Sequence, residues 1–267
     1  MLKTLTHPTT GQTFKMGRKR PVARGPRFSL KNYIQKSLPS PPVICNYALN
    51  ATKALEQIYL NDQLGDCVIA CMAHTENVFN GNAGITPTIY TPQQITELYS
   101  KIGGYVPGDP STDNGCDEQT ALNYWQRTGN PLPRIQAWMA VNGNDPVEVR
   151  TALWLFENLM FGVELPDTWV NPMPSESGFQ WNVAGPPDPD NGHCFFGVGY
   201  GSIGVNISTW GMVGAISNAA IEKYATTEGQ GELYTVISTT AIAKATQKAP
   251  NGFDWSQLLA DFDSMKG

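Results

Sequence analysis

Two residues far apart in the sequence carry the chemistry of a thiol nucleophile and its base. Cys67 follows Gly65-Asp66 at the start of a segment with helical character. The free N–H groups and the dipole at a helix N-terminus stabilise a thiolate there. His193 follows Asn191-Gly192 and leads into an apolar run that ends at Tyr200. A cysteine that opens a helix and a later histidine that opens a strand indicate a cysteine nucleophile with its base. We therefore predict that the Cys67 sulfur lies within about 4 Å of a ring nitrogen of His193.

The segments that must position this pair have clear boundaries. Asp66 predicts a helix that begins at Cys67 and stops at Gly81, and Thr91-Pro-Gln-Gln is a capping box whose helix should end at Gly103-Gly104. Further helices are expected at 117–127, from 145 to about 160, and after Asp254, and strands at 161–165, 194–200, 205–210 and 233–237. Because the helices precede the strands, the fold class is α+β with segregated layers, not a doubly wound sheet.

Several of these motifs, spread from about Ala51 to Ser238, resemble those of the papain-like cysteine peptidases, especially their shorter bacterial and phage-type relatives. Leu-Gly-Asp-Cys67 resembles the nucleophile turn of that family, and the Gly192-His193 strand is similar to its Gly-His-Ala-Val-x-x-Val-Gly-Tyr stretch. Ser208-Thr-Trp-Gly211 falls where the family has Asn-Ser-Trp-Gly. The middle and closing parts of the family are matched by Thr91–Tyr99, Asp113-Asn-Gly-Cys116, Leu122-Asn-Tyr-Trp125 and Glu232–Ser238.

The resemblance implies a papain-like fold, with the cysteine helix in a helical layer and the histidine in an antiparallel β layer. It implies that Cys67 is the nucleophile, that His193 is the general base and acid, and that Ser208 orients the imidazole. Trp210 would shield the pair from water. Asn61 stands where the family has its oxyanion glutamine, and Gln63 is the alternative donor. No cofactor and no metal ion is implied.

Three departures from the family pattern bear on activity. Ser208 replaces an asparagine, and a hydroxyl fixes an imidazole less rigidly than an amide does. Asp66 places a carboxylate beside the thiol, and a negative charge there raises the thiol pKa. Asn61 has a shorter reach than glutamine, and the loss of one oxyanion donor can reduce the rate ~10²-fold or more. The sequence thus leaves two functions open: a thiol hydrolase that cleaves peptide or amide bonds, or an inactive papain-like scaffold in an assembly such as a phage virion.

Charge divides the chain into two parts. The first 55 residues contain no Asp or Glu but ten Lys and Arg, whereas the other 212 hold eight basic residues and all 23 acidic ones. Frequent Pro and Gly interrupt the basic part, so we predict an extended arm at 1–44 and a papain-like domain at 45–267. We expect the arm to lie outside the core, on an acidic protein partner or assembly surface. Binding to nucleic acid is less favoured, and an inhibitory propeptide or a solvated tail are further interpretations.

Composition and the number of cysteines bear on the location of the protein and on a possible metal site. No run of 18 apolar residues predicts a membrane span, and the first residues lack the apolar run of a secretory signal. Five cysteines, an odd number, indicate free thiols and a cytoplasmic or virion location. Cys67, Cys71 and His74 share one helix face and suggest a metal site, but a core-facing stripe of small residues explains the same spacing better.

Overall fold

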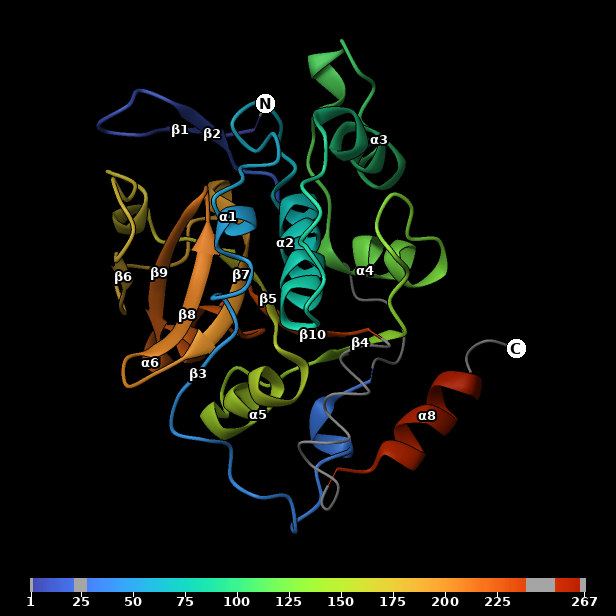
Figure 1. The fold of residues 1–267 in the computed structure, drawn as a ribbon. Helices are drawn as coiled ribbons and strands as arrows, with labels where there is room; N and C mark the ends of the chain where they lie inside the picture. The colour runs from blue at the N-terminus through green and yellow to red at the C-terminus, as the bar shows by residue number, and fades with distance from the viewer. Residues whose placement is uncertain (1, 22–27, 239–252, 265–267) are drawn as a thin grey trace.

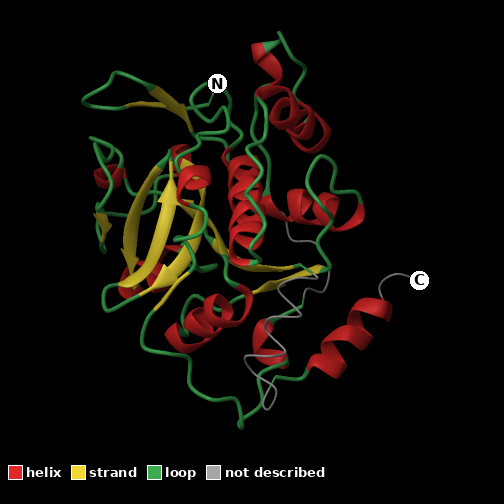
Figure 2. Ribbon diagram, in the orientation of Figure 1, coloured by secondary structure: helices red, strands yellow, loops and turns green. Residues whose placement is uncertain are grey.

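A largely antiparallel sheet forms one layer of the molecule, and a group of helices forms the other (Figures 1 and 2). The computed structural model describes residues 2–21, 28–238 and 253–264. In these parts the main sheet has eight strands, seven of them in the order β4-β10-β5-β7-β8-β9-β6, with β3 also paired to β7. The strands are β3 (Cys45–Asn46), β4 (Ala137–Ala140), β5 (Leu159–Glu164), β6 (Gln180–Trp181), β7 (Gly192–Tyr200), β8 (Gly204–Thr209), β9 (Met212–Ser217) and β10 (Glu232–Ile237).

The longest described helix, α2, stands against the sheet with α3 and α4 on its other side (Figure 1). The helices are α1 (Thr52–Leu55), α2 (Cys67–Asn82), α3 (Pro92–Gly103), α4 (Glu118–Arg127), α5 (Pro146–Phe156), α6 (Asn218–Tyr224) and α8 (Trp255–Ser264). Single turns of 3₁₀-helix lie at Leu30–Asn32, Pro110–Thr112, Asp167–Trp169 and Pro189–Asn191. No helix in the described ranges combines the length and the apolar character needed to cross a membrane.

Strand β7 separates two hydrophobic cores. Cys194, Phe196 and Val198 face the core that contains the buried side of α2, whereas Phe195 and Tyr200 belong to the core on the other side. Successive side chains of a strand point to opposite faces, so residues 194–196 alternate between the two cores. A register shift in the β7–β8 pairing between Gly197 and Gly199 interrupts this alternation, and Tyr200 lies in the core of Phe195. All nine of its residues are buried. The resulting α+β arrangement of a helical layer on an antiparallel sheet is the one predicted from the sequence.

The capping residues recognised in the sequence act as expected at four helices. Thr91 accepts a hydrogen bond from the Gln94 backbone N–H, and the Gln94 side chain accepts one from the Thr91 N–H, which completes the capping box of α3. The side chains of Asp117, Asp145 and Asp254 accept from backbone N–H groups in the first turns of α4, α5 and α8. These bonds satisfy N–H groups that have no partner within the helix.

Other boundaries differ from the predicted ones. Helix α5 ends at Phe156 and not near Met160, because Glu157 takes a left-handed backbone conformation and β5 begins at Leu159. The sequence analysis did not identify β4, β6, β9 or α6. Strand β6 has only two residues, too few to show an alternation of apolar and polar side chains. Strand β9 follows β8 through a tight turn at Trp210-Gly211, which the sequence analysis did not recognise as a turn.

The basic arm does not extend away from the core, and this part of the prediction is wrong. Its first described residues form the hairpin β1 (Thr4–Thr6) and β2 (Thr13–Lys15), which lies across the end of the molecule where α2 begins (Figure 1). Five apolar residues of the arm are buried in the core on the sheet side: Leu5, Phe14, Met16, Leu30 and Tyr33. Burial of this apolar surface outweighs the preference of a Pro- and Gly-rich segment for solvent.

The acidic surface that faces the described arm belongs to the same chain. Lys15 pairs with Asp113 at 2.7 Å and Arg18 with Glu232 at 3.2 Å, while Arg20 forms two hydrogen bonds to Glu164. Lys3 lies 3.4 Å from Asp167 and 3.5 Å from Asp188. Arg24 and Arg27 fall outside the described residues. These acidic partners lie 98 to 214 residues after the basic residues that they contact. The charges of neighbouring residues in the sequence therefore do not reveal them.

Replacement of Phe14 by alanine tests whether the arm is part of the folded unit. Phe14 is 1% exposed and its ring centroid lies 6.0 Å from that of Trp210. We expect Phe14→Ala to lower the free energy of unfolding by about 3–5 kcal/mol, as for other buried aromatics. Denaturant unfolding measures the change. Thr6→Ala, on the exposed face of the same hairpin, is the control and should stay within about 0.5 kcal/mol. Equal, small effects of both variants would mean that the arm is not docked.

Candidate active site

The predicted catalytic residues gather around one small cavity between α2 and the sheet. Cys67, His193, Asn61, Ser208 and Trp210 all line it. Its volume of about 10 Å³ is close to the smallest that holds a water molecule. Cys67 and His193 are each 1% exposed, so the pair is shut off from solvent. The predicted separation of about 4 Å between the sulfur and the ring stays a prediction.

Cys67 is the first residue of α2, as predicted. Asp66 occupies the N-cap position, but its side chain makes no capping bond and is completely buried. Burial raises the pKa of Asp66 well above its usual range. Burial thus disfavours the charged form of the carboxyl group that stands beside the thiol.

His193 is held by two contacts. Its Nε2 lies 2.7 Å from the Thr209 hydroxyl, and its ring stacks on Trp210 with centroids 4.6 Å apart and planes inclined by 23°. Trp210 adopts a left-handed backbone conformation, with φ of 53°, in the turn that joins β8 to β9. The other ring nitrogen, Nδ1, is buried without a hydrogen-bond partner among the described residues. The contact of Nε2 thus fixes the orientation of the imidazole ring, and Nδ1 is available to accept a proton.

The side chain that orients the imidazole is Thr209, not Ser208. The Ser208 hydroxyl donates to the Leu55 carbonyl of α1 at 3.4 Å. Ser208 and Thr209 are neighbours on β8, so their side chains point to opposite faces of the sheet. Ser208 pairs with Phe196, which faces the helical layer, and Thr209 therefore lies on the face of His193 and Phe195. The hydroxyl that contacts His193 thus lies one residue after the position that the family motif indicates.

Of the two oxyanion candidates, Asn61 reaches the cavity and Gln63 does not. Asn61 is 3% exposed, and its Nδ2 donates to the carbonyls of Lys15 at 3.1 Å and Leu64 at 3.2 Å. Gln63 is exposed on the surface and is not part of the cavity wall. The Asn61 amide is positioned to donate a hydrogen bond, but in this state a carbonyl of the arm receives it.

Burial keeps both members of the pair uncharged. It raises the pKa of the Cys67 thiol to about 12, and backbone hydrogen bonds from Cys194 and Gly17 offset only part of the rise. It lowers the pKa of His193 to about 3. A charged group loses its hydration in such a site, so the neutral forms are favoured. Thiol and imidazole are therefore neutral over the physiological pH range.

The backbone of the arm passes directly through the cleft. The Cys116 N–H donates to the Gly17 carbonyl and the Lys19 N–H donates to the Cys116 carbonyl, both at 3.0 Å. On the opposite wall, the Arg18 N–H donates to the carbonyl of Gly192 at 3.1 Å. Cys116 precedes α4 and Gly192 begins β7, so the arm joins the helical layer to the sheet.

Glycine is required where the arm crosses the thiol. A Cβ atom on Gly17 would lie 1.8 Å from the carbonyl oxygen of Gly65, two residues before Cys67. A Cβ atom on Gly115 would lie 1.9 Å from the carbonyl oxygen of Gly17. The three glycine backbones are thus in direct contact. The sequence analysis missed the roles of Gly17, Arg18 and Thr209, because each depends on a contact between distant segments.

The possible metal site on α2 finds no support in the described residues. No group of three or more His, Cys, Asp or Glu side chains there has a metal-binding arrangement. His74 packs its ring against Tyr59, with centroids 5.0 Å apart. Cys71 lies beside Cys194 of β7. The stripe of Cys67, Cys71 and His74 is therefore the core-facing side of the helix.

The sequence matches no protein-family model and no curated protein, but the structure is similar to several solved ones. Xylellain, a cysteine protease from Xylella fastidiosa, superposes with a TM-score of 0.63 at 15% identity, over 90% of this chain and 99% of that one. Digestive procathepsin L 3 of Tenebrio molitor superposes with a TM-score of 0.54 at 13% identity, over 79% of this chain and 76% of that one. Procathepsin B S9 from Trypanosoma congolense superposes with a TM-score of 0.51 at 13% identity, over 84% of this chain and 87% of that one. The chain has the papain-like cysteine protease fold.

Within this papain-like fold, variants of β8 distinguish the two hydroxyls. Thr209→Val leaves the buried Nε2 of His193 without a partner, and we expect a loss of about 1–3 kcal/mol in the free energy of unfolding. Ser208→Ala removes a long hydrogen bond to a carbonyl and should cost less than about 1 kcal/mol. Imidazole ¹⁵N chemical shifts should change in Thr209→Val alone. A shift of the His193 signals in Ser208→Ala alone would restore the prediction from the family motif.

The lowered pKa of His193 predicts a specific pH dependence of stability. In the unfolded chain the ring binds a proton below about pH 6.5, whereas the folded ring resists it down to about pH 3. Protons therefore favour the unfolded state, and stability falls as the pH drops through this window. Between pH 7 and 5 we expect the wild type to lose about 2 kcal/mol relative to His193→Gln, as measured by denaturant unfolding at each pH. A difference that does not vary with pH would mean that His193 titrates normally.

Proposed function

We propose that this protein is a papain-like thiol hydrolase that cleaves peptide or related amide bonds, held closed in the described state by its own arm. One observation carries the proposal. Cys67 opens α2 beside a histidine whose Nε2 is bound by a hydroxyl, whose ring is covered by Trp210 and whose Nδ1 is free. A thiol hydrolase needs this division of labour between the two ring nitrogens.

In the closed state the pair is too buried to react. Removal of residues 15–19 from the cleft would expose Cys67 and His193 to water. Hydration of the charged forms would lower the thiol pKa and raise the imidazole pKa, so that a proton can pass from Sγ to the ring. The helix N-terminus at Cys67 then favours the thiolate. The arm therefore controls activity through desolvation as well as through steric exclusion.

The chemistry of the open site follows from the same residues. The Cys67 thiolate attacks the substrate carbonyl carbon, and the developing oxyanion accepts a hydrogen bond from Asn61 Nδ2, which the Lys15 carbonyl occupies in the closed state. Protonated His193 gives its proton to the leaving amine, which leaves an acyl-enzyme. His193 then takes a proton from water as the water attacks the thioester, and the acid product and free thiol are released.

Similar solved structures include precursor forms of cysteine proteases. Procathepsin L 3 and procathepsin B S9 are proenzymes by name, and a ragweed protease, Amb a 11, was solved in its proform and superposes with a TM-score of 0.52 at 12% identity. A segment of the chain that fills the cleft is consistent with such a state. The inhibitory role considered for the basic arm is thus favoured over its role as an external docking segment.

The inactive scaffold remains the second candidate because a threonine hydroxyl replaces the amide that orients the imidazole in the family pattern. Docking of the arm on an acidic partner loses much of its support, since Lys3, Lys15, Arg18 and Arg20 meet acidic groups of their own chain. A virion role and a cytoplasmic or virion location stay predictions.

Gly17→Ala tests the proposal in the full-length chain. The added methyl group cannot fit against Gly65, so it should displace the arm from the cleft. We expect alkylation of Cys67 by iodoacetamide to accelerate ~10-fold or more, because the rate follows thiolate fraction and access. Peptide mass mapping measures it, with buried Cys71 as the internal reporter of an intact fold. Gly201→Ala, where a Cβ meets no atom and the backbone has no left-handed conformation, is the matched control and should leave Cys67 protected.

Hydrolysis of a fluorescent casein by the same variant then separates the two functions. Activity in Gly17→Ala that disappears in Gly17→Ala/Cys67→Ala supports the hydrolase. A Cys67 that alkylates readily while casein stays intact from pH 4 to 9 would favour the scaffold.

A further inference from the structure

We propose that the buried pocket around Glu232 is a guanidinium-binding site that selects an arginine side chain of the substrate, and that Arg18 of the arm occupies it in the closed state. The claim that the bound arginine belongs to a substrate rests on the proposed function, whereas the guanidinium-binding site itself does not require catalysis. The observations come from the contacts of Arg18, the donors around Glu232 and the cavity beside them.

Arg18 is buried in a way that a surface arginine is not. Its side chain is completely inaccessible to solvent. Nη2 donates to a carboxylate oxygen of Glu232 at 3.2 Å, and Nη1 donates to the carbonyl of Gln230 at 3.1 Å. Arg18 is also the residue whose backbone pairs with Cys116 and with Gly192, on the two walls of the cleft. Its side chain therefore enters the pocket from the position of a peptide lying in the cleft.

Glu232 is prepared to receive such a cation. One carboxylate oxygen faces Arg18, and the other accepts from the Tyr234 hydroxyl at 2.6 Å and from Gln119 Nε2 at 3.2 Å. Gln119 Nε2 also donates to the Tyr234 hydroxyl at 2.8 Å. These bonds fix the orientation of the carboxylate before a guanidinium arrives. A carboxylate with fixed geometry discriminates for the planar guanidinium fork.

A second carboxyl group, Glu118, lies at the same pocket. Burial and the neighbouring Glu232 raise the pKa of Glu118 well above its usual range, which disfavours a second negative charge beside Glu232. It accepts a hydrogen bond from the Cys194 thiol at 3.1 Å. A Cβ atom on Gly162 would lie 1.8 Å from Glu118 Oε2 and 2.9 Å from Arg18 Nε, so the pocket exists only because β5 has a glycine there. The ion pair of this pocket is the one between Arg18 and Glu232.

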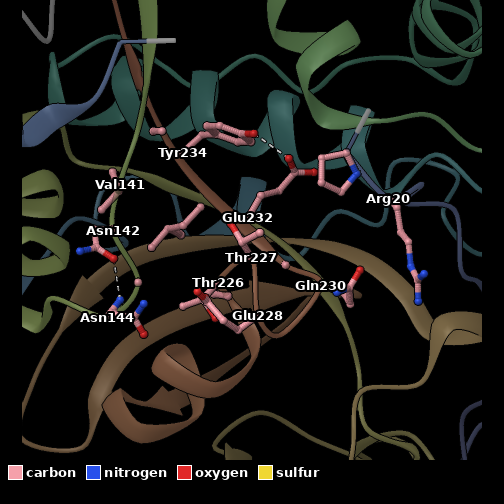
Figure 3. Close-up of a pocket in the computed structure, with 16 residues that line it drawn as sticks. Arg20, Val141, Asn142, Asn144, Thr226, Thr227, Glu228, Gln230, Glu232 and Tyr234 are labelled. Atoms are coloured by element: carbon pink, nitrogen blue, oxygen red, sulfur yellow. Dashed lines mark hydrogen bonds between the residues drawn. The ribbon is translucent and has the colours of Figure 1, made fainter. Parts of the chain in front are cut away.

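An open cavity of about 490 Å³ gives access to the same carboxylate (Figure 3). Figure 3 shows Glu232 and Tyr234 at one side of this cavity, joined by their hydrogen bond, with Gln230 and Arg20 nearby. Asn142 and Thr226 lie on a farther part of its wall. A small cation can therefore approach Glu232 from solvent without passing Cys67.

The need for a cation in this pocket follows from its burial. Glu232 is 7% exposed in the closed state. When Arg18 leaves, its carboxylate loses the charged partner and keeps the neutral donors Tyr234 and Gln119, and an unpaired charge in such a site is strongly unfavourable. A peptide that displaces the arm is favoured when it supplies a guanidinium at the same point. The substrate class is therefore peptides with an arginine near the scissile bond, held by Glu232.

Chemical rescue of Arg18→Ala tests the site without catalysis. The probe is n-propylguanidinium, which reproduces the arginine side chain beyond Cα, and n-propylurea is its neutral counterpart. We expect millimolar n-propylguanidinium to raise the melting temperature of full-length Arg18→Ala by about 2–4 °C, and n-propylurea to leave it unchanged. The wild type, whose pocket is filled, should not respond. Equal effects of both probes would overturn the proposal.

The role of Glu232 is tested in the same assay. The rescue should vanish in Arg18→Ala/Glu232→Gln and persist in Arg18→Ala/Glu164→Gln, where the lost carboxylate is the partner of Arg20. Rescue that survives Glu232→Gln would place the binding elsewhere and overturn the proposal.

Cleavage by Gly17→Ala then tests the substrate class separately. Paired peptides that carry arginine or its neutral isostere citrulline should differ ~10²-fold in kcat/KM, because a buried carboxylate loses its charged partner in the second. Absence of any cleavage alongside successful rescue would overturn the hydrolase and keep the guanidinium site. Equal cleavage of both peptides would overturn the arginine preference and keep the hydrolase.

Discussion

The backbone hydrogen bonds of residues 15–19 to both walls of the cleft are the interaction on which the described state depends. Through Cys116 the arm is bound to the segment before α4, and through Gly192 it is bound to the start of β7. No side chain can stand between Gly17 and the two glycines it touches, so the backbones approach closely enough to exclude water. This closure brings about both the burial of Cys67 and the burial of His193.

The electrostatic state of the site follows from that closure. A thiol and an imidazole in contact with water form an ion pair at modest cost, whereas the same groups under the arm lose hydration and stay neutral. Burial acts in the same direction on Asp66 and raises the pKa of its carboxyl group well above the usual range. Glu232 is paired with Arg18 at 3.2 Å. Adjacent residues of the arm, Gly17 and Arg18, thus lie against the segment before Cys67 and pair with Glu232.

Local signals explain what could be predicted from the sequence. The capping bonds join residues two to three positions apart, as at Thr91, Asp117, Asp145 and Asp254. The starts of helices can therefore be predicted without knowledge of the fold. The positions of Cys67 at the start of a helix and of His193 near the start of a strand are predicted by the same means. The α+β layering follows from the order of these elements.

The errors arise where distant segments decide the outcome. The choice between Ser208 and Thr209 depends on which face of β8 meets His193, and a one-residue offset in register reverses that choice. The arm was expected to dock outside the core because its own neighbourhood holds no acid, yet Glu232 follows Arg18 by 214 residues. The other paired basic residues of the arm likewise meet acids that lie on β5, in loops and in a 3₁₀ turn far along the same chain. Local charge patterning cannot report such contacts, because the attraction between two charges depends on their separation in space and not on their separation in sequence.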